Sequence, residues 1–286
     1  MNAAAQLADL LAQRFVKNSP PNLGKLCKDL GLRIQEVPAK GFDGALVRSK
    51  SGQKGIVAVK ASILEASRKR FTIAHEIGHF VIPHHRLLKN ICEEKKIDSF
   101  DTRLNRPEME ANEFAAELLL PSAIVTGRFN LGEYSLSAIS AVATEFETSL
   151  TATARCFLRL TPLPCAMVWS VASQARWFAR SDTFRFFLTV TDLPAVGSFA
   201  SKIFNGSVAP SEFAPVSAGA WLERQAAERV DILLEHSIPM PNYNAVLTLL
   251  WAYKTAPAAT STEDEEDLLG ELDPQDFTLG RRKWPR

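Results

Sequence analysis

Residues 70–80 read RFTIAHEIGHF and place His75 and His79 four positions apart, with Glu76 between them. On an α-helix, residues four apart lie on the same face, one turn above the other. Both histidines can therefore direct an imidazole nitrogen at one ion. Glu76 would project about 100° away from His75, where a carboxylate suits a general base better than a metal ligand. The segment predicts a zinc site with two histidine ligands and a catalytic glutamate.

The residues around this motif indicate that its helix is buried. They are apolar or small: Phe71, Ala74, Ile77, Gly78 and Val81. Burying two imidazoles and a carboxylate costs several kcal/mol unless they are satisfied, and a metal ion with its water satisfies all three. Glycine inside a helix costs about 1 kcal/mol relative to alanine, so we expect another element to approach Gly78 closely. The alternative interpretation is a chance pair of solvent-facing histidines.

A second segment, residues 108–121 (EMEANEFAAELLLP), supplies candidates for a third ligand. A catalytic zinc ion takes three protein ligands and keeps one position open, where the pKa of its water falls to about 7. Glu108 begins a helical stripe of otherwise small residues, which would let this helix pack closely against the first. We therefore favour Glu108 as the ligand, with Glu110 and Glu113 as alternatives. Together with Glu117, these two fall on another stripe that we expect to be solvated.

The stretch from about residue 22 to residue 121 resembles the ImmA/IrrE family of metallopeptidases. The resemblance rests on RFTIAHEIGHF and, from residue 108, EMEANEFAAELLLP. It implies a zincin-like fold and one zinc ion held by two histidines and a glutamate. His75 and His79 match the histidine ligands, Glu76 matches the base, and Glu108 matches the glutamate ligand. Family members are similar in cleaving a helix-turn-helix repressor, which derepresses stress or mobile-element genes.

Two further histidines, His84 and His85, follow the motif helix. They lie where a side chain could stabilise the oxyanion of the reaction, although a solvated loop is the expected setting. The metal is expected to be zinc, while manganese or iron could fill a site of two histidines and a glutamate in the cell.

Apolar periodicity and turn residues predict an α+β chain. The first part is expected to form helices at 3–16, 23–30, 62–82 and 108–120 and strands at 32–37, 44–48 and 55–59. Residues 135–160 predict two short helices joined near Thr148, with Ser149 capping the second. They resemble the helix-turn-helix-like element that often follows in this family. Beyond Pro164 we expect strands at 167–171, 176–180, 184–190 and 245–253 and a helix at 221–235.

These elements predict four parts. Residues 1–130 form a zincin-like metallopeptidase domain with the HExxH helix and a small sheet. Residues 131–162 form a helix-turn-helix-like segment, and residues 163–256 a mixed α/β accessory or sensor-like domain. Residues 257–286 form a charged, flexible tail, because an acidic block followed by basic residues lacks the apolar content to fold alone.

Composition excludes several classes of protein. The 286 residues are 46% apolar and carry a formal net charge of +1, so nothing points to nucleic acid or an anionic membrane. The N-terminus lacks the basic region of a signal peptide, and the apolar stretch Ala245–Tyr253 is far shorter than the ~20 residues that span a bilayer. Four cysteines without metal-binding spacing, Cys27, Cys92, Cys156 and Cys165, are expected to be free buried thiols in a cytoplasmic protein.

Two alternatives compete with a site-specific zinc endopeptidase. One is a DNA-binding regulator with a vestigial peptidase fold, based on residues 135–160. The second helix of that segment offers only Arg155 and Arg159 as basic residues among apolar ones, so we expect a packed element and no direct DNA binding. The other is an accessory protein that acts through binding alone. The oligomeric state is left open.

Overall fold

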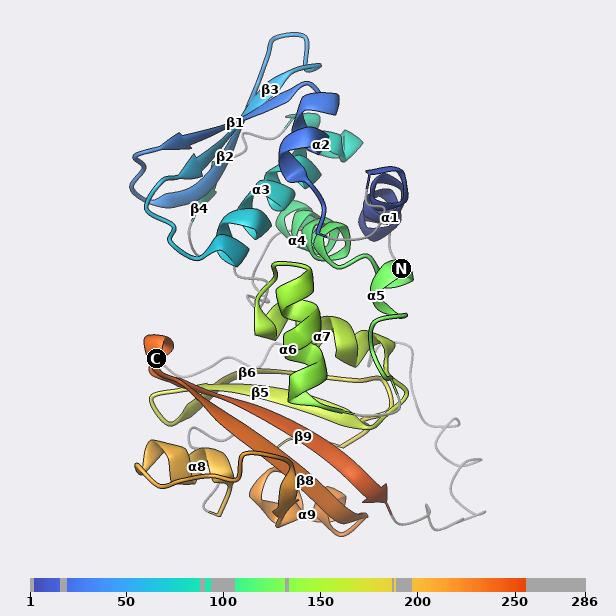
Figure 1. The fold of residues 1–286 in the computed structure, drawn as a ribbon, viewed down its shortest axis with the longest axis vertical. Helices are drawn as coiled ribbons and strands as arrows, with labels where there is room; N and C mark the ends of the chain where they lie inside the picture. The colour runs from blue at the N-terminus through green and yellow to red at the C-terminus, as the bar shows by residue number, and fades with distance from the viewer. Residues whose placement is uncertain are drawn as a thin grey trace, which may run out of the picture.

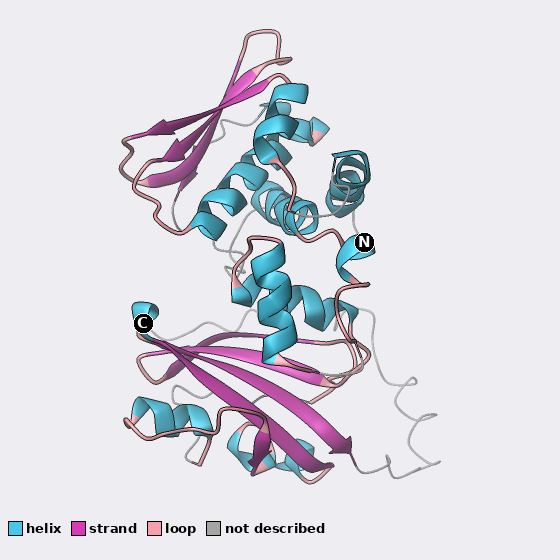
Figure 2. Cartoon of the chain, viewed as in Figure 1, coloured by secondary structure: helices cyan, strands magenta, loops and turns pink. Residues whose placement is uncertain are grey.

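The computed structural model describes residues 3–15, 20–87, 91–93, 106–131, 134–186, 188 and 197–255. Helices and two sheets alternate along the described chain, so the expected mixed α+β class is confirmed (Figure 1). One sheet lies with helices α1 to α4 at one end of the molecule, and the other lies at the opposite end (Figure 2). The tail predicted at 257–286 lies outside the described residues.

The first sheet has four strands in the order β1-β3-β2-β4. Their bounds are β1 (Leu32–Val37), β2 (Phe42–Arg48), β3 (Gly55–Lys60) and β4 (Ile91–Glu93). β1 runs parallel to β3, whereas β2 is antiparallel to both β3 and β4. Gly52 adopts a φ of 71°, as the turn between β2 and β3 requires. The three predicted strands are confirmed, and β4 is an addition that the sequence did not indicate.

Four helices pack beside this sheet: α1 (Ala3–Phe15), α2 (Leu23–Asp29), α3 (Ala66–Val81) and α4 (Arg106–Leu119). α3 carries the HExxH motif and packs against α4. A Cβ atom added at Gly78 would lie 2.9 Å from Phe114 Cδ1 on α4. This confirms the expected close approach at Gly78, because a glycine there lets the two helices come together.

The middle of the molecule consists of three helices: α5 (Ser122–Val125), α6 (Leu136–Glu145) and α7 (Leu150–Leu160). Ser149 caps α7, since its Oγ accepts a hydrogen bond from the backbone of Ala152 at 3.2 Å. The prediction of two short helices with this cap is therefore confirmed. Glu147, in the turn between α6 and α7, has a φ of 52°, a left-handed conformation that costs free energy for any residue but glycine.

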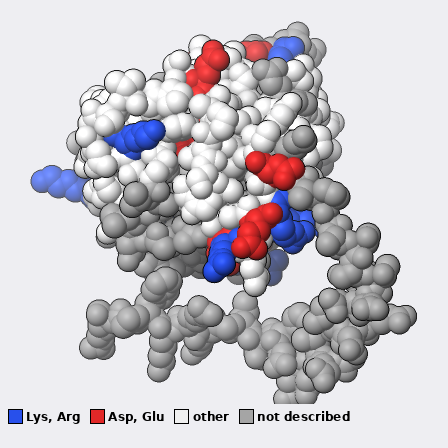
Figure 3. Space-filling model, turned by 90° about the horizontal axis from the view of Figure 1, so that it is seen from below, with Lys and Arg blue, Asp and Glu red and all other residues white. Residues whose placement is uncertain are grey.

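The second sheet has five strands in the order β6-β5-β9-β8-β7. The strands are β5 (Cys165–Val171), β6 (Gln174–Arg180), β7 (Ala214–Val216), β8 (Val230–Met240) and β9 (Ala245–Thr255), and the pairs are antiparallel. α6 and α7 lie on one face of the sheet, while α8 (Phe199–Phe204) and α9 (Arg224–Ala227) lie on the other (Figure 1). Seen from below, the described part of this half shows sparse charges of both signs (Figure 3).

The helix predicted at 221–235 is wrong. Only Arg224–Ala227 is helical there, and strand β8 begins at Val230. The pairing of β8 with β9 overrides the helical pattern, because strand preference depends on cross-strand neighbours more than on local propensity. Of the strand predicted at 184–190, the described residues contribute only an isolated bridge between Leu188 and Leu222.

The interior is divided into separate apolar cores. One lies among α1 to α4 and the first sheet. A second joins α6 and α7 to the sheet through Met167, Leu247 and Leu249, and a third fills the far side of that sheet. Residues 134–160 thus share a core with the strands that follow them. Cys27, Cys156 and Cys165 are buried free thiols, as expected, whereas the side chain of Cys92 lies outside the described set.

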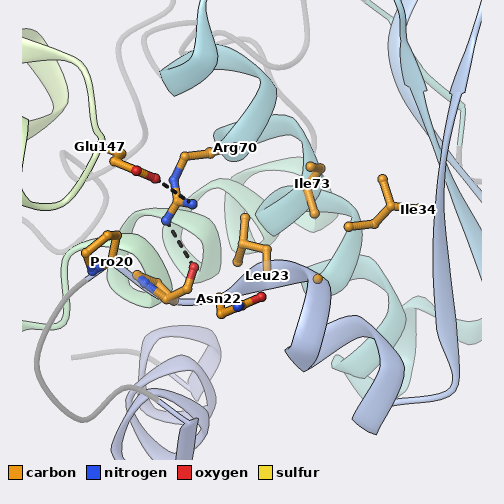
Figure 4. A pocket seen from close by; sticks show the side chains of 9 residues that line it. Pro20, Asn22, Leu23, Ile34, Arg70, Ile73 and Glu147 are labelled. Carbon is orange, nitrogen blue, oxygen red and sulfur yellow. Dashed lines mark hydrogen bonds and ion pairs between the residues drawn. The ribbon is translucent and has the colours of Figure 1, made fainter.

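Arg70 of α3 links the two halves of the molecule. Its guanidinium donates to the carbonyl of Pro21 at 3.1 Å and forms an ion pair with Glu147 at 3.0 Å (Figure 4). A shallow cavity of about 430 Å³ opens beside this contact, lined by Pro20, Pro21, Asn22, Leu23, Gly24, Ile34, Arg70, Ile73 and Glu147. The halves therefore meet through a polar contact next to incompletely filled space.

Candidate metal centre

The two motif histidines face each other from successive turns of α3. His75 and His79 are 0% and 1% exposed, and their Nε2 atoms lie 3.1 Å apart. The last turn of α3 is held by Arg48 of β2, which donates to the carbonyl oxygens of His79 and Phe80. Cations near a helix C-terminus are stabilising, so this contact fixes the turn that carries His79.

Glu108 reaches the same point from the first turn of α4. Its Oε2 lies 3.3 Å from His75 Nε2, and its Oε1 lies 3.6 Å from His79 Nε2. One ligand atom from each of the three residues falls within 4.8 Å of the others. Burial opposes ionisation of Glu108, but the two imidazoles beside it hold the pKa of this carboxyl well below its usual range. Glu110 and Glu113, the alternative ligands, are not in this group.

Each histidine has a partner on its second ring nitrogen, and the sequence did not reveal either partner. His75 Nδ1 lies 2.8 Å from Asn112 Oδ1, and His79 Nδ1 lies 3.0 Å from His85 Nδ1. An amide oxygen only accepts, so His75 donates through Nδ1 and keeps a lone pair on Nε2. Such contacts orient the histidine ligands of metal sites. Asn112 lies one helical turn after Glu108 on α4. This spacing is the feature of the sequence that could have indicated Asn112 as a partner of the site.

Glu76 lies on the side of α3 that faces β2. It is 0% exposed. A Cβ atom added at Gly44 would lie 2.7 Å from Glu76 Oε1 and 2.6 Å from Thr72 Cγ2. Gly44 therefore leaves the space that the Glu76 carboxylate occupies between α3 and β2.

Two expectations about neighbouring residues are wrong. His85 does not lie in a solvated loop: it is 0% exposed in the 3-10 helix η1 (Pro83–Leu87), because it packs against His79. Glu117 is also buried, at 1% exposed, since it accepts hydrogen bonds from the backbone and hydroxyl of Ser122 at 2.7 and 2.9 Å. His84, by contrast, has a side chain that is 60% exposed.

Glu110 accepts hydrogen bonds from His84, His85 and Arg106. It accepts from His84 and from His85 Nε2 at 3.0 Å on one oxygen, and from Arg106 Nε at 2.9 Å on the other. Burial opposes ionisation of Glu110, but these donors lower its pKa to about 2. His84, His85 and Glu110 also form a group whose ligand atoms lie within 4.8 Å of one another.

The chemistry of the first group fits a divalent transition metal. Two imidazole nitrogens and one carboxylate are the donors that zinc takes at catalytic sites. The side chains of His75, His79 and the ionised Glu108 are buried or nearly so. Water therefore cannot solvate each of these three polar groups separately. A cation held between them satisfies all three at once.

Comparison with known proteins relates the part of the chain that carries this site to a peptidase family. Residues 27–157 match the model of peptidase family M78, described as the IrrE N-terminal-like domain. This part of the chain is therefore similar to the domain of that family, which confirms the resemblance to the ImmA/IrrE metallopeptidases. Among curated proteins, none matches the chain in sequence.

A similar fold occurs in a solved structure, a Mycobacterium tuberculosis transcriptional regulator. The match has a TM-score of 0.50 and 11% identity, and it covers 88% of this chain and 76% of the other. At that identity the likeness concerns the fold alone.

None of the helices that the structure describes combines the length and apolar composition that spanning a bilayer requires.

Proposed function

We propose that this protein is a zinc-dependent endopeptidase with a zincin-like catalytic domain. His75, His79 and Glu108 hold the metal, and Glu76 is the general base. The observation that carries the proposal is the convergence of three donor atoms from α3 and α4 within 4.8 Å, beside a buried glutamate of the same helix. The family match of residues 27–157 supports a peptidase-like domain at this place in the chain.

Each side chain has a separate role in hydrolysis. A zinc ion at this site supplies Lewis acidity toward a peptide carbonyl and toward water. Glu76 accepts the proton of the attacking water and returns it to the leaving amine, a task that contributes about 10²–10⁴-fold in rate when a base is well placed. Asn112 and His85 hold the imidazoles of His75 and His79 in position through Nδ1.

The substrate that we propose is a helix-turn-helix repressor in the cytoplasm, whose cleavage derepresses stress or mobile-element genes. The family resemblance supports this choice. Direct DNA binding is not part of the proposal, because α7 packs into the core: Arg159 is its only exposed residue. The visible described face of the C-terminal half also lacks a continuous basic patch (Figure 3).

The test is cleavage of helix-turn-helix repressors encoded beside the gene, read by mass spectrometry. We expect the wild-type protein with zinc to cut one repressor at a defined bond and the Glu76→Gln variant to leave it intact. Cleavage at the same bond and rate by both proteins would contradict the role of Glu76. A wild-type protein that binds the repressor without cutting it would favour the alternative, a regulator with a vestigial peptidase fold.

A further inference from the structure

We propose that His85 and Glu110 form a hydrogen-bonded chain that sets the orientation and the proton position of His79 for metal binding. The proposal rests on the proposed function, because it takes His79 to be a metal ligand. It assigns a role to two residues outside the three-ligand group. Both act through His79, so they are positioning residues.

A series of hydrogen bonds leads from Arg106, at the exposed start of α4, to the buried site. Arg106 donates to Glu110 Oε1 at 2.9 Å, and Glu110 Oε2 lies 3.0 Å from His85 Nε2. His85 Nδ1 then lies 3.0 Å from His79 Nδ1. The rings of His79 and His85 are tilted by 44°, with centroids 4.9 Å apart. Because His85 is 0% exposed, the series is protected from water at its centre.

The direction of each hydrogen bond follows from the carboxylate in this series. An ionised carboxylate only accepts, so His85 must donate through Nε2. A neutral imidazole carries one N–H, which leaves the Nδ1 atom of His85 as an acceptor. His79 must then donate through Nδ1, and its lone pair is left on Nε2. That nitrogen is the one directed at His75 and Glu108.

The same reasoning argues against a second ion at His84, His85 and Glu110, although their ligand atoms lie close enough together. An ion on His85 Nε2 would move its hydrogen to Nδ1, where it would face the N–H of His79 across 3.0 Å. Arg106 already donates a hydrogen bond to the second oxygen of Glu110. The chain and a second ion therefore exclude each other, and we expect one zinc ion per protein.

Adjacent histidines supply a matched test in the full-length protein. His85→Phe removes the acceptor for His79 and keeps an aromatic ring, whereas His84→Phe changes the 60% exposed neighbour, which touches the same carboxylate. We expect zinc affinity to fall about 10–100-fold in His85→Phe, as for other partners of metal-bound histidines, and to change far less in His84→Phe. In the zinc-free proteins, where no metal fixes the ring hydrogen, the ¹⁵N shifts of the His79 ring should show a protonated Nδ1 in wild type and lose that single state in His85→Phe.

Glu110→Gln is the second variant, in case His85→Phe fails to fold. The amide of a glutamine can donate to His85 Nε2, which would place the His85 hydrogen on Nδ1 and the His79 hydrogen on Nε2. The metal-binding nitrogen of His79 would then be protonated, so zinc affinity should again fall. Unchanged affinity in either folded variant, with the His79 signals of wild type, would overturn the chain while leaving the peptidase proposal intact. Two zinc equivalents in wild type and one in His85→Phe would replace the chain by a second metal site. A wild-type protein without zinc binding would instead overturn the proposed function.

Discussion

The Nε2 atoms of His75 and His79 lie 3.1 Å apart in the interior of the protein. Asn112 occupies the other ring nitrogen of His75, and His85 occupies that of His79. Both lone pairs are thus directed at one point, which Glu108 approaches from α4. This arrangement distinguishes the site from a chance pair of histidines, because three separate elements contribute to it.

Glu76 and Glu108 should respond differently to substitution. Glu76→Gln should keep zinc and lose about 10²–10⁴-fold in kcat, since we propose that this carboxylate acts on water and not on the metal. Glu108→Ala should lower zinc affinity itself, because it removes one of the three donors. Zinc content and cleavage rate, measured on the same preparations, separate the two roles. Loss of metal in the Glu76 variant, with metal retained in the Glu108 variant, would show that the roles are exchanged.

Gly44→Ala should displace the Glu76 carboxylate. The added methyl group would lie 2.7 Å from Glu76 Oε1, so that side chain must move. We expect a lower kcat with zinc affinity close to wild type. Gly127→Ala is the control, because its added methyl group would meet nothing closer than 3.8 Å. Equal activity of both variants would show that the position of Glu76 does not matter to the reaction.

Arg70 and Glu147 should contribute unequally to stability. Arg70 is mostly buried and also donates to the carbonyl of Pro21, so Arg70→Ala should lower the free energy of unfolding by about 1.5–3 kcal/mol. Glu147→Ala should cost less than about 1 kcal/mol, because Glu147 is more than half exposed. Urea denaturation followed by fluorescence measures both. Equal losses would place the energy in the ion pair and not in the backbone contact.

The described cysteines should be unreactive in the native protein. Burial raises the pKa of the Cys27 thiol to about 12 and also raises those of Cys156 and Cys165. The thiolate is the reactive form. In a Cys92→Ser variant, we expect a thiol reagent at neutral pH to label the protein only after denaturation. Rapid labelling of the folded variant would show that one of these cores opens readily.

The sequence predicted the centre of the site because local spacing determines it. The i, i+4 pair on α3 and the glutamate at the start of α4 belong to periodic helices, whose faces can be derived from the residues alone. Gly78 likewise indicated close helix packing, which Phe114 explains. The α+β class followed from the same patterns.

The remaining features depend on contacts between distant segments. His85 and Glu117 were expected in solvent, but His79 and Ser122 provide partners that allow them to be buried. The helix predicted at 221–235 gave way to strand β8, which is stabilised by pairing with β9. Local periodicity contains no information about such partners. Glu235 of β8 is a further example of a charged residue that is buried because a distant residue pairs with it. It is 0% exposed and accepts from the Trp221 ring at 2.8 Å.

Zinc titration of the full-length protein by calorimetry tests the central claim most directly. We expect wild type to bind one equivalent, and His75→Ala and His79→Ala to lose stoichiometric binding while their circular dichroism stays close to wild type. Their Nε2 atoms define the site, so removal of either ring leaves too few donors. A wild-type protein that binds no zinc, or folded variants that both retain a full equivalent, would contradict the assignment of this site as a zinc centre.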